Sequence, residues 1–277
     1  EFLPVRRPWR SVYMNLRSHR KLMVVDGRVG FVGGMNIREC CLLERRPRSP
    51  VQDTHFRVEG PVVDQMFATF ADDWSFNTGE RLEGPPWESR SAPAGSVLAR
   101  GIPDGPDEDF ETLHWTFSAA LGTARDRVRI VTPYFIPDQR LIAALRLAAL
   151  RGVTVDILLP ERSNLRIVEW AGMAQLWQVL EPGCRVWLTP PPFDHSKLFV
   201  VDGCWSLVGS ANWDARSLRL NFEYDVECYD EDLARTLHAH CDAKIREAKP
   251  LTLDDVDRRS VALRLRDNLV RLLSPYL

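Results

Sequence analysis

The stretch HSKLFVVDGCWSLVGSAN, residues 195–212, decides the fold, because the chain repeats its construction as HRKLMVVDGRVGFVGGMN, residues 19–36. A single offset of 176 residues aligns the two copies without a gap. Ten positions are identical, and in the first copy they are His19, Lys21, Leu22, Val24, Val25, Asp26, Gly27, Val32, Gly33 and Asn36. Repetition at so long a separation is not the short period of a solenoid, so it predicts a duplicated lobe.

Each copy is predicted to form a hairpin. Apolar and β-branched residues dominate both arms, and Asp-Gly supplies the turn between them. Side chains two apart on a strand share a face, so His19 lies beside Lys21, and His195 beside Lys197. Small and amide-bearing residues close the second arm: Gly34 and Asn36 in one copy, Ser210 and Asn212 in the other. Imidazole, ammonium and amide groups together predict an anion site.

The duplication, rather than either copy alone, carries the functional prediction. A lone His beside a Lys most often marks an ordinary surface strand. Matched His, Lys, Asp and Asn in both copies instead predict two half-sites that meet across a pseudo-twofold axis. Two imidazoles and two ammoniums facing one phosphodiester supply a nucleophile, a general acid and charge stabilisation. No metal and no other cofactor is therefore expected.

The pattern H-x-K-x4-D-x6-G-[GS]-x-N, present twice, resembles the phospholipase D superfamily. Further segments are similar to bacterial cardiolipin synthases: DTHFRVEGPVV (53–63), TPYFIPD (132–138), AALRGVTVDILLPERSN (148–164), GSANWDARSLRLNFEYDVE (209–227) and the closing RLLSPYL. The resemblance runs from about Leu16 to the C-terminus. It is interrupted in residues 36–50, NIRECCLLERRPRSP, where the family usually carries an acidic, aromatic stretch.

The resemblance implies phosphatidyl transfer from one phosphatidylglycerol to another through a phosphohistidine, with release of glycerol. It assigns attack on phosphorus to His19 and proton transfer to His195, and these two roles are exchangeable. The groups expected to hold the phosphate oxygens are Lys21, Lys197, Asn36, Asn212, Ser210 and Gly34.

Each imidazole also needs a carboxylate that fixes its tautomer. Candidates follow each hairpin: Asp53 lies 34 residues past His19, and Glu223 lies 28 past His195. Similar acids orient the histidines in the resembled family, and an exposed strand residue is the alternative for each. Asp26 and Asp202 sit at the turns, so they are predicted to hold structure rather than to take part in catalysis.

The predicted fold class is α/β, with two homologous phospholipase D-like lobes of mixed β-sheet flanked by helices and the active site between them. Residues 1–78 are assigned to the C-terminal part of the first lobe, 79–95 to a Gly-, Pro- and Ser-rich linker, and 96–277 to the second lobe with a C-terminal helix. Only eighteen residues precede His19. An equivalent first lobe needs about eighty more, so the chain is expected to be an N-terminally truncated piece.

Alternating elements are predicted ahead of His195: strand 97–100, helix 108–123, strand 128–132, helix 138–150, strand 153–159, helix 164–180 and strand 184–188. Residues 61–79 and 261–277 are predicted to be amphipathic helices. Residues 132–135, Thr-Pro-Tyr-Phe, are expected at a strand end, where α/β proteins place ligand crevices. In helix 164–180, the apolar positions are Ile167, Trp170, Ala174, Trp177 and Val179, and a core face is favoured there over a lipid-facing groove.

Charge limits the partners. The formal net charge of -2 argues against a dedicated nucleic-acid binder. Basic residues gather locally, first as Arg6, Arg7, Arg10, Arg17, Arg20 and Lys21, then as Arg45, Arg46 and Arg48. Such clusters attract anionic lipid headgroups, although a solvated basic face is an equal interpretation of the second. The expected partners are phosphatidylglycerol and a membrane surface, and the sequence specifies no oligomeric state.

Six cysteines show no metal-binding spacing and are interpreted as reduced thiols. No apolar run is long enough to span a bilayer, and no signal peptide is visible. Contact with the bacterial inner membrane is therefore expected to be peripheral for this stretch, with membrane segments expected further upstream in the parent, as in many relatives.

Three alternatives stay open. A phospholipase D-type hydrolase would use the same residues with water as the acceptor. A superfamily nuclease is disfavoured by the charge balance. The third is an inactive fragment, because a truncated first lobe would expose a sheet edge and apolar surface.

Overall fold

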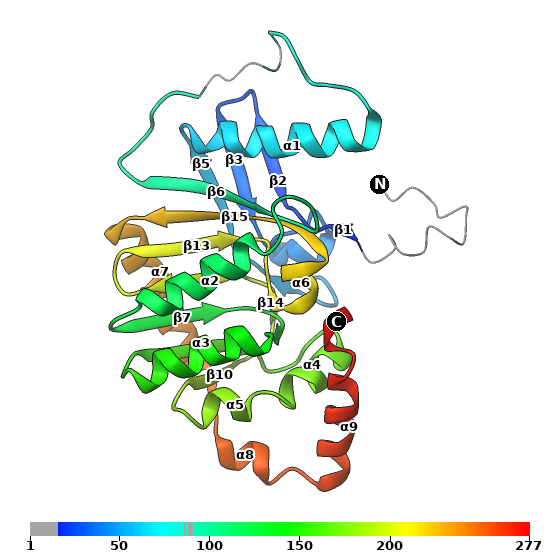
Figure 1. The fold of residues 1–277 in the computed structure, drawn as a ribbon, viewed down its shortest axis with the longest axis vertical. Coiled ribbons are helices and arrows are strands. Elements are labelled where there is room, and N and C mark those ends of the chain that lie inside the picture. Colours follow the sequence, from blue (N-terminus) through cyan, green and yellow to red (C-terminus); the bar gives the residue numbers. More distant parts are fainter. Residues whose placement is uncertain (1–15, 86, 88–90) are drawn as a thin grey trace, which may run out of the picture.

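The computed structural model describes residues 16–85, 87 and 91–277 and has a mixed α/β architecture (Figure 1). Its main sheet has nine strands in the order β1-β15-β13-β12-β7-β9-β10-β16, with β6 also paired to β15. These strands are β1 (Arg17–Ser18), β6 (Leu98–Asp104), β7 (Arg127–Val131), β9 (Thr154–Pro160), β10 (Arg185–Thr189), β12 (Leu198–Val201), β13 (Trp205–Gly209), β15 (Asn221–Tyr229) and β16 (Lys249–Leu251). β7, β9 and β10 run parallel while β12, β13 and β15 alternate, so the predicted mixed sheet is confirmed.

Three smaller sheets lie beside it. One has the order β2-β3-β5, and the other two are the pairs β4-β11 and β8-β14. Their strands are β2 (Leu22–Val25), β3 (Val29–Gly33), β4 (Val51–Gln52), β5 (His55–Glu59), β8 (Phe135–Ile136), β11 (Phe193–Asp194) and β14 (Trp213–Asp214). The sheet β2-β3-β5 carries the first copy of the repeated motif on β2 and β3, whereas β12 and β13 of the main sheet carry the second copy.

Helices cover both faces of the main sheet. They are α1 (Val62–Thr78), α2 (Thr112–Thr123), α3 (Gln139–Leu150), α4 (Arg166–Met173), α5 (Trp177–Leu180), α6 (Ala215–Arg219), α7 (Glu231–Glu247), α8 (Leu253–Asp257) and α9 (Val261–Arg271), with 3-10 turns η2 (Glu39–Cys41), η3 (Leu43–Arg45) and η4 (Ser274–Tyr276). Side chains of successive residues on a strand point to opposite faces of the sheet. Ile130 packs in one core with Phe117 of α2, and Val131 packs in the other with Leu237 of α7.

The repeat is visible in the strand register. Leu22 pairs with Val32 across β2 and β3, and Leu198 pairs with Val208 across β12 and β13, which preserves the offset of 176 residues. A third strand pairs with each hairpin at the equivalent position. Gly33 of β3 pairs with His55 on β5, and Gly209 of β13 pairs with Asp225 on β15. Both predicted hairpins are therefore present. The division into lobes at residues 79–95 stays a prediction.

The two copies of the motif meet through matched strand pairs. Residues 17–18 of β1 run parallel to residues 221–222 of β15, and residues 193–194 of β11 run parallel to residues 51–52 of β4. The same offset relates β1 to β11. Each copy thus places the two residues before its histidine against the two residues before the other copy's candidate acid.

Helix 61–79 is confirmed as α1, which ends with Gly79 in the left-handed conformation. The prediction of one helix over 164–180 is wrong, because α4 ends at Met173 and α5 begins at Trp177. Val168 of α4 packs in a small cluster near the C-terminus, whereas Leu176, in the break between α4 and α5, packs in the main core.

The predicted core face of that segment also needs correction. Val179 is fully buried, but Ile167 is 49 % exposed and Trp177 is 44 % exposed. The C-terminal helix is shorter than predicted as well, since α9 ends at Arg271 and gives way to η4 around Pro275. These apolar side chains on the surface become important below.

Some predictions lie outside the described residues, namely those for Arg6, Arg7 and Arg10 and for part of the linker, residues 86 and 88–90. Among the described residues, none of the helices combines the length and the apolar character needed to cross a lipid bilayer.

Candidate active site

The two motif histidines each hold a carboxylate from the other copy. Nδ1 of His19 lies 2.8 and 2.9 Å from the two carboxylate oxygens of Glu223. Nδ1 of His195 lies 2.8 Å from Oδ2 of Asp53. Each acid follows one hairpin in the sequence but serves the histidine of the other, so the pairing is crossed.

Backbone contacts enforce this crossing. The amide of His19 donates to the carbonyl of Phe222 at 2.8 Å, and the amide of His195 donates to the carbonyl of Gln52 at 2.7 Å. These bonds continue the parallel β1-β15 and β11-β4 pairs by one residue. The next residue on each partner strand is the acid, so strand pairing delivers a carboxylate to each ring.

The two motif lysines adopt the same local arrangement. Nζ of Lys21 donates to the carbonyl of His19 at 2.7 Å, and Nζ of Lys197 donates to the carbonyl of His195 at 2.6 Å. Lys197 also lies 3.0 and 3.2 Å from the two ring nitrogens of His195. The prediction that these residues lie on a strand is wrong, because β2 begins at Leu22 and β12 at Leu198. In the second copy the Lys197 ammonium nevertheless lies beside the His195 imidazole.

Burial shifts both lysines toward the neutral form. Loss of hydration lowers the pKa of Lys21 to about 8 and that of Lys197 to about 7, while the carboxylates of Glu223 and Asp53 oppose both shifts. Because each lysine senses both acids, the four groups belong to one cluster. A bound phosphate adds negative charge to this cluster and favours the protonated lysines.

Glu223 has further hydrogen-bond partners in addition to His19. Its carboxylate accepts from Oγ of Ser210 at 2.6 Å, from Nδ2 of Asn221 at 3.1 Å and from Oγ of Ser217. Complete burial penalises the charged carboxylate, yet the neighbouring charge of His19 and these hydrogen bonds hold the pKa of Glu223 below its usual value. Glu223 is therefore a fixed anion beneath His19.

Asp53 has a plainer setting. Its Oδ1 accepts from the amide of Thr54 at 2.8 Å. A Cβ at Gly34 would lie 2.4 Å from that oxygen and 2.9 Å from the carbonyl of His195, so the Gly34 backbone closes against this pair. Burial, and then the charge of Lys197, lower the pKa of His195, while Asp53 acts in the opposite direction. The His195 ring is thus biased toward the neutral form.

The two histidines differ in access. The side chain of His19 is 28 % exposed, against 10 % for His195. The predicted amides differ too: Asn212 is buried and its Oδ1 has no hydrogen-bond partner among the described residues, whereas Asn36 is exposed. Asn212 is therefore placed to meet a ligand from inside the site, and Asn36 lies at its rim.

The turn aspartates lie elsewhere. Asp202 follows β12, at the end away from His195, and accepts backbone N–H bonds at 2.9 to 3.2 Å from residues 125–127. Asp26 and Gly27 both adopt positive φ in the turn between β2 and β3. Neither aspartate bonds to a motif histidine.

Several site groups were not found from the sequence. Ser217 and Asn221 bind Glu223, and Asp225 accepts from the amides of Ser210 and Ala211 at 2.7 and 3.0 Å. Asp225 lies two residues past Glu223 on one strand, and that spacing is a signal that was available. Ser217 comes from α6, and no periodicity marks it.

Tyr134 also borders the site. Its ring lies edge-on to that of His195 with centroids 6.2 Å apart, and its hydroxyl donates to Asn164 at 2.8 Å. The expected crevice residues after β7 therefore do approach a motif histidine. Away from this site, a cleft of about 330 Å³ lies between α4, α5, α8 and α9, and none of the motif residues lines it.

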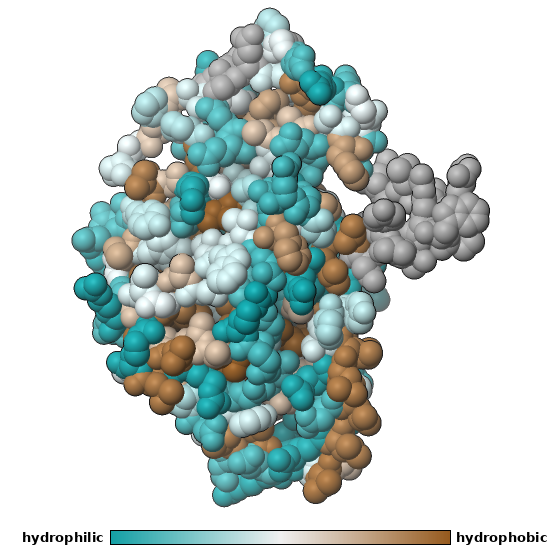
Figure 2. Space-filling view, in the orientation of Figure 1, coloured by the Kyte–Doolittle hydropathy of each residue, from teal (hydrophilic) through white to brown (hydrophobic). Residues whose placement is uncertain are grey.

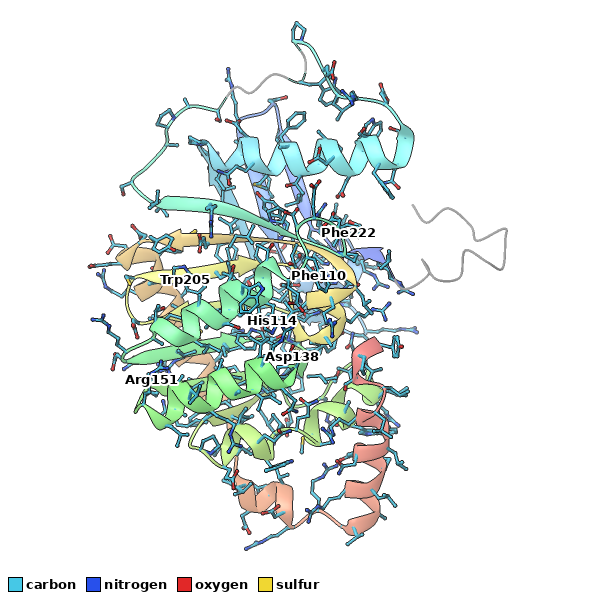
Figure 3. All side chains as sticks on the ribbon, in the orientation of Figure 1. Phe110, His114, Asp138, Arg151, Trp205 and Phe222 are labelled. Atoms are coloured by element: carbon cyan, nitrogen blue, oxygen red, sulfur yellow. The ribbon has the colours of Figure 1, made fainter. Side chains whose placement is uncertain are left out.

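A third His–carboxylate pair provides a structural contrast. His114 of α2 lies 3.2 Å from Asp138, which caps α3 by accepting from the amide of Leu141 (Figure 3). This pair links two helices and has no lysine of the motif type beside it. Within the part of the chain that the structure describes, His, Cys, Asp and Glu side chains form no group of three or more suited to a metal ion.

Comparison with known proteins agrees with this geometry. Residues 117–245 match the family model described as "Cardiolipin synthase, PLD-like domain". A cardiolipin synthase from Geobacillus sp. (strain WCH70) is 35 % identical over 278 residues, covering all of this chain and 55 % of the relative. Residues 117–245 therefore carry a phospholipase D-like domain, and the whole chain is similar to cardiolipin synthases.

Cardiolipin synthase A from Pseudomonas fluorescens is 39 % identical over 265 residues, covering 95 % of this chain and 55 % of the relative. The chain thus spans about half the length of the curated relatives that it matches. Among solved structures, the phosphatidylserine synthase of Haemophilus influenzae Rd KW20 superposes with a TM-score of 0.71 at 14 % identity, covering 94 % of this chain and 71 % of that one. That likeness shows that the two proteins share a fold.

The buried His19–Glu223 pair predicts a specific pH dependence of stability. Because the folded-state pKa of Glu223 is depressed, its contribution is full above the unfolded-state pKa and is lost as the pH falls through the folded-state pKa. We expect Glu223→Gln to cost about 3 kcal/mol in the free energy of unfolding at neutral pH. Denaturant titrations of both proteins should show the gap narrowing below pH ~4.

The control is Glu44→Gln, at an exposed carboxylate, which should leave the free energy of unfolding unchanged at every pH. A Glu223→Gln penalty that stays constant down to acidic pH would contradict an ionised Glu223 in the folded protein.

Proposed function

We propose that this chain carries both catalytic half-sites of a cardiolipin synthase, which transfers a phosphatidyl group between two phosphatidylglycerol molecules. The observation that carries the proposal is the crossed arrangement of two His–carboxylate pairs with a lysine beside each. Similarity to cardiolipin synthases along the whole chain supports this substrate class.

The proposed reaction has two balanced steps. Nε2 of one histidine attacks phosphorus, so a P–N bond forms and the bond from phosphorus to the oxygen of the headgroup glycerol breaks. The other histidine gives its proton to that oxygen, and glycerol leaves. A hydroxyl of the second phosphatidylglycerol then loses its proton to the same histidine and attacks phosphorus. The P–N bond breaks, and cardiolipin is the product.

The remaining groups have supporting roles in this proposal. Lys21, Lys197 and Asn212, with Asn36 and Ser210 at the motif ends, stabilise the charge on the non-bridging oxygens. The Gly34 backbone permits close approach. Asp53 and Glu223 are positioning residues, because each holds Nδ1 of a ring and leaves Nε2 for the reaction.

The nucleophile can be either His19 or His195, with the other histidine as the proton donor. The family resemblance gives the attack to His19. The lowered pKa of His195 favours the reverse, because neutral imidazole is the nucleophilic form. Trapping the phosphoenzyme during turnover and mapping the modified residue separates the two assignments, and modification at any other residue contradicts both.

We further propose that the lipids are taken from the surface of a bacterial inner membrane and that nucleic acid is not a substrate. The formal net charge of -2 gives a polyanionic strand no general attraction. Phosphatidylglycerol instead presents a single phosphodiester, which matches one pair of half-sites.

The proposal is tested by incubating the protein with labelled phosphatidylglycerol in mixed micelles that contain a chelator, then separating the lipids. We expect cardiolipin and an equal amount of released glycerol, undiminished by the chelator. Phosphatidic acid as the main product would replace the synthase with a hydrolase, and cleavage of plasmid DNA instead would indicate a nuclease.

His195→Ala should lower cardiolipin formation by roughly 10³-fold or more, because both half-sites act on one phosphorus. The matched control is His240→Ala on α7, a histidine outside both motifs whose Nε2 has no hydrogen-bond partner among the described residues, which should retain the normal rate. Initial rates in the micelle assay measure both. A near-normal rate for His195→Ala would rule out the two-histidine scheme.

A further inference from the structure

Helix α9 turns its apolar side outward. Val261, Leu265, Leu269 and Leu272 recur at helical spacing along one face, and they are 81, 60, 58 and 71 % exposed. Leu273 and Tyr276 extend the row into η4 and are also exposed. Figure 2 shows this hydrophobic band along α9 at the lower right edge of the molecule. An exposed row of this length calls for a partner.

The inner side of the helix is polar and firmly held. Asp267 is 1 % exposed and binds Arg259 at 2.5 Å and Arg266 at 2.7 Å. The guanidinium of Arg266 also lies 4.0 Å from the ring centre of Trp170 on α4. Rotating α9 to bury its leucines would break the ion pairs of Asp267 and the contact of Arg266 with Trp170. The outward orientation is therefore a property of the fold.

The charges beside the apolar row are positive. Residues 258–277 contain five arginines and one aspartate, although the whole chain has a net charge of -2. On a helical wheel Arg264 and Arg271 lie on one flank of the leucine row, whereas Arg266 is turned inward to Asp267. Leucines flanked by arginines are the pattern of a helix that lies in the interface of an anionic bilayer.

The same region adjoins the candidate active site. Arg216 of α6 donates to the carbonyl of Tyr276 in η4 at 2.8 Å, and the next residue, Ser217, binds Glu223. Val270 of α9 packs in the small cluster that includes Tyr134, whose ring borders His195. In Figure 1, α9 and η4 lie on the side of the molecule that also carries β1 and α6. The α9–η4 segment therefore lies beside the candidate site.

We propose that α9 and η4, with exposed Leu165 and Ile167 at the start of α4, form the surface by which this protein docks on an anionic phospholipid bilayer. This assignment rests on the proposed function, because it places the catalytic groups at the surface that holds their substrate. The leucines enter the acyl boundary while the flanking arginines meet lipid phosphates. The site then receives headgroups without any lipid leaving the bilayer.

A second copy of the chain fits this surface less well. Two α9 helices packed face to face about a twofold axis would bring the flanking arginines of both copies together. Like charges at a desolvated contact are unfavourable. An anionic bilayer instead complements the apolar row and the arginines at once.

The test is cosedimentation with vesicles, first of phosphatidylcholine mixed with phosphatidylglycerol and then of phosphatidylcholine alone. We expect the chain to bind the anionic vesicles at least tenfold more tightly. The combined change Leu265→Ser, Leu269→Ser and Leu272→Ser should weaken that binding at least tenfold. Leu147→Ser with Leu150→Ser is the matched control, because these α3 leucines are 58 and 69 % exposed and belong to no such row.

Arg264→Gln separates the charge contribution, since it should reduce the preference for anionic vesicles and the sensitivity of binding to salt. Far-UV circular dichroism and thermal unfolding establish that each variant is folded. The proposal is overturned if the α9 variant binds vesicles like the parent, if the α3 variant loses as much affinity, or if the α9 changes only dissociate a dimer.

Binding is measured without turnover, so it can succeed where the proposed activity fails. Where activity is present, cardiolipin formation on vesicles is compared with turnover of monomeric dihexanoyl phosphatidylglycerol. The α9 variant should lower the ratio of the two rates at least tenfold. An unchanged ratio together with normal vesicle binding counts against docking, whereas vesicle binding with no turnover of either substrate counts against the proposed function alone.

Discussion

The structure depends on an exchange of carboxylates between two copies of one motif. Nδ1 of His19 holds Glu223, and Nδ1 of His195 holds Asp53, so neither copy contains a complete pair by itself. Short parallel strands that precede each histidine and each acid impose this exchange. The site can form only when both copies are folded and docked, which links its assembly to the stability of the whole chain.

Within that symmetry the halves have diverged. Ser210 binds Glu223, whereas its counterpart Gly34 offers no hydroxyl and packs against Asp53. Asp225 faces Gly209, and His55 occupies the matching place against Gly33. One histidine therefore sits over a carboxylate with many donors, and the other is buried beside a lysine whose pKa is lowered. Unequal environments of this kind suit a reaction that needs one nucleophile and one acid.

The sequence predicted what local pattern and repetition determine. The single offset yielded both hairpins and their shared register, and the acids were located at matched places after each hairpin. It could not predict which histidine each acid would reach, because that depends on strand pairing across 142 and 204 residues. Ser217 was not predicted as a site residue, because no sequence pattern in its helix marks it. The prediction of one helix over 164–180 was wrong, and its two ends pack into different clusters. The outward row on α9 required the structure, since an amphipathic pattern does not say which side meets the protein.

The most direct measurement of the central claim is the NMR signal of the histidine side chains, with His19 and His195 assigned by substitution. The crossed pairing predicts that Asp53→Asn alters the Nδ1 proton and tautomer of His195 and leaves those of His19 nearly unchanged. Glu223→Gln should act on His19 in the same selective way. If Asp53→Asn instead perturbed His19, or if each acid affected the histidine of its own copy, the exchange of carboxylates would be contradicted.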